Sequence, residues 1–200
     1  MADLTTLMES PLAHLHARMH AQSGEAVALR EVPFTPMTSL RLEGGSTACA
    51  RVEKALGQSL PTTVGDTAGD GGLTALWLGP DEWLLVASPT DEPSGSPAGF
   101  DELVDALGDA RGAVVDVSAN RTILELSGPC ARAVLEKGCP TDLHPRSFPV
   151  GRAITATLGP VPLLLWRTDE ETYRLLPRSS FADYVARWTL DAMGEYAGAL

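Results

Sequence analysis

The sequence predicts an α+β protein made of two related halves. Short apolar runs, several of them alternating in polarity, have the pattern of β-strands, and helical stretches with recognisable ends separate them. The first and second parts of the chain also resemble each other, which indicates a duplicated architecture. The predicted strands include residues 38–42, 74–78, 83–87, 113–117 and 122–126.

Two predicted helices directly follow strands, and the two passages match each other. One helix starts after a glycine turn, where Ser46 or Thr47 can cap it, and it ends before Gly57. The other has Pro129 at its first helical position and ends before Gly138. Each passage therefore reads as a strand, a glycine turn and a helix.

Each half continues with a hairpin and a second helix. Residues 76–85 and 165–176 resemble each other as two apolar strands joined by an acidic turn. Further helices are predicted at residues 100–107 and 181–193. Both halves then have the order strand, helix, two strands and helix, which is a split α/β, or ferredoxin-like, pattern.

These patterns divide the chain into three parts. We expect an N-terminal arm at residues 1–36, a first α+β half at 37–118 and a second half at 119–200, with the halves forming one compact unit. The halves can form two sheets or share one sheet. The segment at residues 12–19 can be an arm that packs on a partner or a helix that folds back on the core of its own chain.

The charge balance argues against polyanionic partners. The chain has 26 acidic and 15 basic residues and a formal net charge of -11, so nucleic acid and anionic membrane surfaces would repel it. The longest apolar run, residues 161–166, is too short to span a bilayer, and the first residues lack the features of a signal peptide. We therefore expect a cytoplasmic protein that binds neither nucleic acid nor membrane.

Cysteine and histidine do not form a predicted metal or disulfide framework. Cys49, Cys130 and Cys139 are odd in number and have no Cys-x-x-Cys spacing. A histidine cluster at residues 14, 16 and 20 places two imidazoles on one helix face, but zinc needs further ligands at fixed geometry. We interpret the cluster as a polar helix face.

Other chemical motifs have structural interpretations. The acids at residues 81–82 and 169–171 fall at predicted hairpin turns, where Asp is favoured for backbone hydrogen bonding. The glycine turn at 44–47 lacks the Gly-Lys-Ser/Thr ending of a phosphate loop, and no serine has a Gly-x-Ser-x-Gly setting. We therefore predict no catalytic, cofactor-binding or metal-binding residue in this chain.

Two polar segments are candidates for a partner interface. The first lies between two predicted strands and carries Asp116, Asn120 and Arg121, and the second is a proline-punctuated loop that carries His144 and Arg146. These groups either satisfy one another within hydrogen-bonded turns or face a partner. They are the site residues that the sequence offers.

A series of motifs runs in order along nearly the whole chain. They are Ser10-Pro-Leu, Leu29-Arg-Glu-Val-Pro-Phe, Leu76-Trp-Leu-Gly-Pro-Asp-Glu-Trp-Leu-Leu, Asp116-Val-Ser-Ala-Asn-Arg-Thr, Lys137-Gly-Cys-Pro, Asp142-Leu-His-Pro-Arg and Arg178-Ser-Ser-Phe-Ala-Asp-Tyr. Together they resemble the gamma-subunit family of heterotetrameric sarcosine oxidases. The resemblance implies an oxidoreductase complex that demethylates sarcosine to glycine with hydrogen peroxide and formaldehyde or methylene-tetrahydrofolate.

The same resemblance implies that this chain is a non-catalytic subunit. Its partners would be the alpha, beta and delta subunits, which would carry FAD, FMN, NAD, zinc and tetrahydrofolate. The sequence has neither a nucleotide-binding loop nor the ligand spacing of a zinc site, which agrees with that expectation.

The second half also resembles, more distantly, the folate-binding domain of the glycine-cleavage aminomethyltransferase. The shared features are the Ser127-Gly128-Pro129 helix start, the Asp142-Leu143 loop and a glycine-centred hairpin. In that enzyme the hairpin carries an essential acidic pair, whereas this chain has Pro162 and Leu163 there. The resemblance therefore implies that this chain has the fold of the folate-binding domain but lacks its acidic pair. The alternative is a free-standing folate-binding protein of one-carbon transfer.

Overall fold

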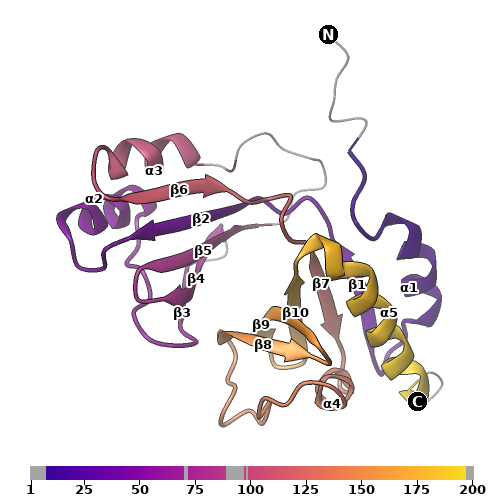
Figure 1. Cartoon of the computed structure of the whole chain (residues 1–200). Helices are drawn as coiled ribbons and strands as arrows, with labels where there is room; N and C mark the ends of the chain where they lie inside the picture. The colour runs from indigo at the N-terminus through magenta and orange to yellow at the C-terminus, as the bar shows by residue number, and fades with distance from the viewer. Residues whose placement is uncertain (1–7, 70–71, 89–96, 98, 197–200) are drawn as a thin grey trace. The chain divides into compact units, whose positions relative to one another are not determined.

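The computed structural model describes residues 8–69, 72–88, 97 and 99–196 (Figure 1). It contains two antiparallel five-stranded sheets and the helices that pack on them, which confirms the predicted α+β class and shows two separate sheets. The chain forms two compact units, Phe34–Ser118 and the combination of Met1–Pro33 with Ala119–Leu200. We call them the central unit and the terminal unit. Among the described residues, the helices are all too short or too polar to cross a bilayer.

The central unit contains one sheet with the strand order β3-β4-β5-β2-β6. Its strands are β2 (Met37–Leu42), β3 (Thr67–Ala68), β4 (Leu73–Gly79), β5 (Glu82–Ala87) and β6 (Gly112–Asp116). Its helices are α2 (Thr47–Leu56) and α3 (Phe100–Leu107). Strands β4 and β5 form the predicted hairpin, with Trp77 opposite Trp83.

Helix α2 begins and ends where the sequence predicts. The Ser46 hydroxyl accepts a hydrogen bond of 3.1 Å from the backbone N–H of Cys49, and Gly57 ends the helix with a positive φ of 70°. Val52 of α2 and Leu103 of α3 then pack on Leu40 and neighbouring apolar residues of the sheet. This packing forms the core of the central unit.

The terminal unit contains the second sheet, with the order β1-β7-β10-β9-β8. Its strands are β1 (Ala28–Val32), β7 (Ile123–Ser127), β8 (Ala153–Leu158), β9 (Val161–Asp169) and β10 (Thr172–Pro177). Its α-helices are α1 (His16–Gln22), α4 (Ala131–Glu136) and α5 (Ala182–Met193). Short 3₁₀ turns lie at η2 (Ala13–Leu15), η3 (Ser179–Phe181) and η4 (Gly194–Tyr196).

The N-terminal segment packs on the core of the terminal unit. Leu12, Leu15 and Met19 are buried there with residues of α4, α5 and the sheet, and Figure 1 shows α1 beside α5. Strand β1, which the sequence analysis placed within an arm, pairs with β7 along its full length. Of the two alternatives for the predicted N-terminal helix, the structure therefore shows the one that folds back on its own chain.

The two sheets have corresponding strand orders. The order β3-β4-β5-β2-β6 can be compared with β8-β9-β10-β7-β1. The first four strands of each sheet follow one another in the same chain order, and α2 then corresponds to α4 and α3 to α5. The outer strands β6 and β1 differ in origin. Strand β6 directly precedes β7 in the chain but pairs with β2, whereas β1 directly precedes β2 but pairs with β7.

Candidate functional site

The first candidate segment uses its polar groups within the chain. Asp116 ends β6 and accepts hydrogen bonds from Ser118, at 2.6 Å from the hydroxyl and 2.9 Å from the backbone N–H. The Ser118 hydroxyl in turn accepts from the backbone N–H of Met37 at 3.0 Å. Asp116 is exposed, yet its carboxylate holds a turn of the central unit together.

Asn120 and Arg121 belong to the terminal unit and face the residues before α5. The carbonyl of Asn120 accepts from the backbone N–H of Ser179 at 2.9 Å, and Arg121 Nη1 donates to the carbonyl of Leu176 at 2.8 Å. Arg121 also forms a backbone bridge with Arg178. The segment thus joins β7 to the end of β10 and the start of η3.

The second candidate segment is an exposed loop that its own side chains hold rigid. Asp142 accepts from the His144 backbone N–H at 2.9 Å and from the Ser147 hydroxyl at 2.6 Å. His144 Nδ1 accepts from the backbone N–H of Arg146 at 3.2 Å. The hydrogen bond from Ser147, with that from His144, holds the pKa of Asp142 below its ordinary value.

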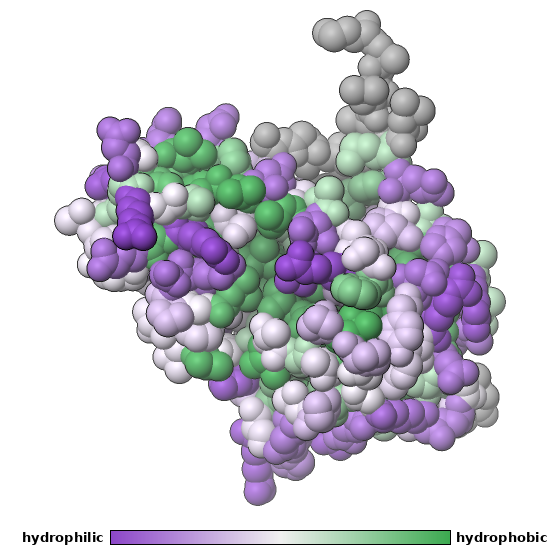
Figure 2. Space-filling view, in the orientation of Figure 1, coloured by the Kyte–Doolittle hydropathy of each residue, from purple (hydrophilic) through white to green (hydrophobic). Residues whose placement is uncertain are grey.

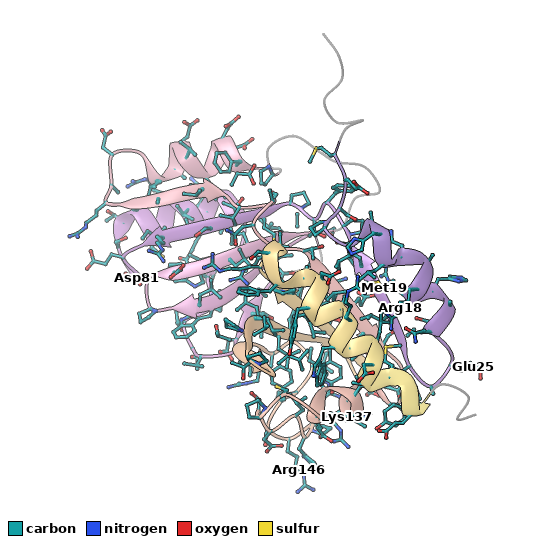
Figure 3. The ribbon with its side chains drawn as sticks, turned by 45° about the vertical axis from the view of Figure 1, so that its right-hand side comes forward. Arg18, Met19, Glu25, Asp81, Lys137 and Arg146 are labelled. Carbon is teal, nitrogen blue, oxygen red and sulfur yellow. The ribbon has the colours of Figure 1, made fainter. Side chains whose placement is uncertain are left out.

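Buried anchors fix the two ends of this loop. Leu143 and Phe148 are buried, and the Phe148 ring stacks on Tyr173 with centroids 6.5 Å apart. Burial raises the pKa of Tyr173. The guanidinium of Arg146 points away from the rest of the unit, as Figure 3 shows. The loop therefore presents His144 and Arg146 on a fixed frame.

Arg167 is a buried charged residue that the sequence patterns did not single out. This buried guanidinium donates to the carbonyls of Phe148 at 2.8 Å and of Glu170 at 2.6 Å, and to Asp169 at 3.2 Å. Tyr173 lies 5.7 Å from it as a cation–π partner. Because a buried guanidinium needs hydrogen-bond acceptors, and these carbonyls supply them, Arg167 ties the loop to the β9–β10 turn.

A second missed group is Glu31, whose side chain is fully buried. One of its carboxylate oxygens accepts from Ser10 at 2.6 Å and contacts His16 Nε2 at 2.7 Å, and the other accepts from Thr122 at 2.6 Å. A carboxylate with this many short partners can remain in the interior. It joins the N-terminal segment, β1 and the residue before β7.

The histidines of the predicted cluster serve different partners. His16 binds Glu31, whereas His14 Nε2 lies 2.7 Å from Asp183 of α5. Arg187, and then His14, hold the pKa of Asp183 below its ordinary value. In the part of the chain that the structure describes, no three residues of His, Cys, Asp or Glu come together in a way that would hold a metal ion.

A hollow of about 240 Å³ lies between α1 and β1. His16, Met19 and His20 line one side, and Leu29 and Arg30 line the other. Sites for small ligands usually have volumes of roughly 300–1,000 Å³ and several convergent polar groups. This hollow is smaller and mostly apolar, and Arg30 is already paired with Glu125.

The paired acids lie at hairpin turns, as predicted. Asp81 lies between β4 and β5, and Glu82 pairs with Arg41 at 2.8 Å. Glu170 lies between β9 and β10. The three cysteines are free thiols. The described polar groups thus support turns, strand ends and the N-terminal segment.

Comparison with solved structures defines the class of fold. The aminomethyltransferase T of the glycine cleavage system from Bartonella henselae aligns with a TM-score of 0.62 and 16% identity, covering 90% of this chain and 56% of that one. At this identity the likeness shows the fold alone. The chain therefore has the fold of an aminomethyltransferase domain.

The particular family follows from closer relatives. The chain belongs to the sarcosine oxidase gamma subunit family, which matches residues 44–195. Sarcosine oxidase subunit gamma of Corynebacterium sp. (strain U-96) is 51% identical over 203 residues, covering 100% of this chain and 96% of the relative. The subunit gamma of Arthrobacter sp is 47% identical and covers 98% of this chain and 95% of the relative.

A solved structure agrees with this family. A chain of the heterotetrameric sarcosine oxidase from Corynebacterium sp. U-96, determined in complex with pyrrole 2-carboxylate, aligns with a TM-score of 0.89 and 50% identity. The alignment covers 96% of this chain and 97% of that chain. The sequence resemblance to the gamma-subunit family is therefore confirmed.

Proposed function

We propose that this chain is the non-catalytic gamma subunit of a heterotetrameric sarcosine oxidase. That complex would oxidise sarcosine to glycine with hydrogen peroxide, releasing the one-carbon unit as formaldehyde or passing it to tetrahydrofolate. The observation that carries the proposal is the end-to-end match with subunits gamma at 46% to 51% identity, together with the TM-score of 0.89.

The positions of Pro162 and Leu163 support a role without catalysis. Both lie in β9, where Pro162 is exposed and Leu163 is buried in the core of the terminal unit. Neither side chain can transfer a proton, so the acid–base function that the aminomethyltransferase resemblance assigns to this hairpin has no counterpart here. The buried ionic groups, Glu31 and Arg167, are engaged in internal hydrogen bonds.

The partners would be the alpha, beta and delta subunits. FAD, FMN, NAD, zinc and tetrahydrofolate would bind to those subunits, since this chain supplies the fold of a folate-binding domain without the acidic pair of that site. We place the complex in the cytoplasm, where free thiols such as Cys49, Cys130 and Cys139 remain reduced.

We also propose that the chain consists of two ferredoxin-like repeats, the second of which takes its fourth strand, β1, from the N-terminal segment. The correspondence of the two strand orders supports this duplication. Counting β2, β4, β5 and β6 as strands 1 to 4 gives the order 4-1-3-2 of a ferredoxin-like unit, and β7, β9, β10 and β1 give the same order. The sequence halves at residues 37–118 and 119–200 would each contain most of one repeat.

The loop that carries His144 and Arg146 is the stronger of the two candidate interface segments. Its hydrogen bonds and buried anchors fix its shape before any partner binds, which reduces the entropy that docking would cost. Asp116, Asn120 and Arg121 would contribute less. The charged groups of Asp116 and Arg121 and the carbonyl of Asn120 are engaged within the chain, whereas the Arg146 guanidinium points away from its unit.

A free-standing folate-binding protein is the second candidate, and the aminomethyltransferase-like fold favours it. Calorimetry with tetrahydrofolate separates the candidates. We expect no binding heat from the isolated chain, whereas tight one-to-one binding would support the second candidate.

The direct test is co-expression with the alpha, beta and delta subunits. We expect a tag on this chain to recover all four polypeptides, and sarcosine turnover only from the assembled complex. The matched control is the tagged chain expressed alone, which should show neither flavin absorbance nor turnover. Turnover by the chain alone would contradict the proposal.

A further inference from the structure

The connection between α4 and β8 is long for a segment without regular structure. It covers residues 137–152, from the end of α4 at Glu136 to the start of β8 at Ala153, and we call it the 137–152 loop. All of its residues are described. Loops beyond roughly 12–15 residues without secondary structure are uncommon in compact domains and usually carry function. The length of this loop therefore needs a reason beyond linking a helix to a strand.

Contacts near both ends fold the 137–152 loop into a fixed shape. The Gly138 carbonyl accepts from the backbone N–H of Gly159 at 2.9 Å, and the Gly151 N–H donates to the Arg167 carbonyl at 2.8 Å. Phe148, within the loop, is buried. Compact surface loops that are packed by their own side chains are frequently functional. The shape of this loop is set before any partner binds, which lowers the entropy that binding would cost.

A buried charge helps to hold this shape. Arg167 is 5% exposed, and its side chain donates to the carbonyls of Phe148 at 2.8 Å and Glu170 at 2.6 Å. Among the described residues, no carboxylate pairs with it. Burial of a charge is costly, and an apolar side chain of similar size would fill the space without that cost. The hydrogen bonds of Arg167 therefore serve the position of the loop more than the packing of the core.

The 137–152 loop presents hydrogen-bond donors on its exposed side. Figure 3 shows Arg146 pointing away from the rest of its unit, and among the described residues its guanidinium has no ion-pair or hydrogen-bond partner. His144 Nδ1 accepts from the backbone N–H of Arg146 at 3.2 Å, so the neutral imidazole carries its proton on Nε2. The Asp142 carboxylate is already occupied by the His144 N–H and the Ser147 hydroxyl. The loop thus offers a guanidinium and an imidazole N–H.

Rigid and apolar residues accompany these donors. Pro145 and Pro149 are exposed on either side of Arg146 in the loop, and Val150 is 48% exposed. Figure 2 shows purple, hydrophilic residues projecting at the bottom of the view, where the loop lies, with paler residues beside them. Apolar neighbours exclude water from a charged contact at the centre of an interface, and the attraction between charges is stronger where water is excluded.

A protein carboxylate is the group that fits these donors. A guanidinium forms two parallel hydrogen bonds with a carboxylate, and the Nε2–H of His144 can add a third. Phosphates would fit the donors as well, but the net charge of -11 repels a nucleic acid. A small free carboxylate would bind in the open, where exposed ion pairs are weak. An Asp or Glu side chain on a surface that covers the loop keeps the contact dry.

We infer that the 137–152 loop binds an Asp or Glu side chain of another subunit through the guanidinium of Arg146, with His144 Nε2–H as the second donor. Because it rests on the proposed function, in which this chain contacts other subunits, the carboxylate belongs to one of those subunits. The proposed function requires such contacts in general, whereas the loop specifies one of them by its chemistry.

The first test reverses one charge in the full four-subunit complex. Arg146→Glu should bind the other three subunits at least about tenfold more weakly than wild type in surface plasmon resonance, because two carboxylates would then face each other. Arg18→Glu is the matched control, since Arg18 is an exposed arginine of the same unit whose side chain bonds only Gln22 among the described residues. We expect its affinity to stay within about twofold of wild type.

A second variant tests the histidine. His144→Asn removes the Nε2 donor while its amide oxygen can still accept from the backbone N–H of Arg146. We expect about threefold weaker binding or more. Wild-type affinity in this variant would contradict the donor role of His144.

A chemical cross-link identifies the occupant directly. Arg146→Lys keeps the positive charge and provides an amine that a carbodiimide joins to a touching carboxylate, with loss of water. The chain has only two lysines of its own, Lys54 and Lys137, so the new bond is readily assigned by peptide mass spectrometry. We expect the amine to be joined to an Asp or Glu of another subunit. Arg18→Lys is the matched control and should give no bond to another subunit.

The outcomes separate this contact from the proposed function. Wild-type affinity in Arg146→Glu would overturn the inference while leaving the proposed function intact. A cross-link from the Arg146→Lys variant that reaches only this chain, no cross-link at all, or an equal yield from the control would overturn it in the same way. Failure of the wild-type chain to bind the other subunits would instead remove the proposed function.

Discussion

The terminal and central units share a strand order but differ sharply in charge. The central unit, residues 34–118, contains 13 acidic and 4 basic residues, for a net charge of -9. The terminal unit contains 13 acidic and 11 basic residues, for a net charge of -2. Most of the acidity of the protein therefore comes from one unit, and most of its arginine lies in the other.

The units also differ in what their interiors hold. Among the described residues, the buried charged side chains are Glu31 and Arg167, both in the terminal unit, whereas the buried polar residues of the central unit are threonines. The terminal unit thus adds directional bonds to apolar packing, and those bonds fix its N-terminal segment and its exposed loop. The same unit carries the exposed aromatic residues Phe181 and Tyr184. Two units with the same strand order therefore differ in charge and in the polar groups that their interiors hold.

The largest expected effect is on the free energy of unfolding, and it compares the apolar cores of the two units. Leu175→Ala in the terminal unit and Leu40→Ala in the central unit each remove a fully buried side chain. We expect each to lower the free energy of unfolding by about 2–5 kcal/mol, because the loss combines transfer and cavity costs. Urea unfolding measures this. A negligible loss for either variant would contradict the expectation that both cores stabilise the fold. Val115→Ala, at an exposed site, is the control.

The buried carboxylate provides the next test. Glu31→Gln keeps the shape but places an amide among the Ser10, His16 and Thr122 groups, so we expect a loss of about 1–3 kcal/mol in thermal or urea unfolding. Glu82→Gln in the central unit changes a partly exposed pair with Arg41, so its effect should stay below about 1 kcal/mol. Equal losses would contradict this account, because the buried carboxylate of the terminal unit would then stabilise the fold no more than the exposed ion pair of the central unit.

The cap of α2 is a smaller local effect in the central unit. Ser46→Ala should cost about 1 kcal/mol in thermal unfolding, because the Cys49 backbone N–H loses its acceptor. Ser46→Asp retains an acceptor and should remain near wild type. If alanine were as stable as aspartate, the hydrogen bond would not stabilise the helix.

The smallest expected effect is a pH dependence of the exposed loop. The pKa of Asp142 is lowered in the folded chain, so its contribution is fully present above the ordinary pKa of 3.8 and is lost as pH falls through the lowered value. Hydrogen exchange at the backbone N–H of His144 should therefore accelerate, relative to the intrinsic rate, below that window. Asp142→Ala should show fast exchange at every pH. If the His144 N–H remained protected from exchange in that variant, contacts other than those of Asp142 would hold the loop.

Local signals predicted much of the regular structure. Residues 100–107 form α3 as expected, and the acidic turns mark the hairpins of both sheets. The expected helix at residues 181–193 is confirmed as α5 from Ala182, because Phe181 belongs to the preceding 3₁₀ turn. These elements depend on neighbours in sequence, which explains why patterns revealed them.

The contacts that were missed depend on distant residues. Strand β1 was assigned to an arm because its partner, β7, lies about 90 residues further along, and pairing at that distance has no local signature. Glu31 lies at an inward-facing strand position, but its acceptor role appears only when Ser10 and Thr122 converge on it. The sequence identified His144 and Arg146 as loop residues, although Arg167, which holds that loop, reads locally as an ordinary strand position.

Native mass spectrometry of the complex purified through a tag on this chain tests the central claim most directly. The account predicts one copy of this 21.1 kDa chain with three different polypeptides, and flavin mass only on subunits other than this one. A tagged chain that emerges alone, or with a flavin or folate bound to itself, would contradict the assignment as a non-catalytic gamma subunit.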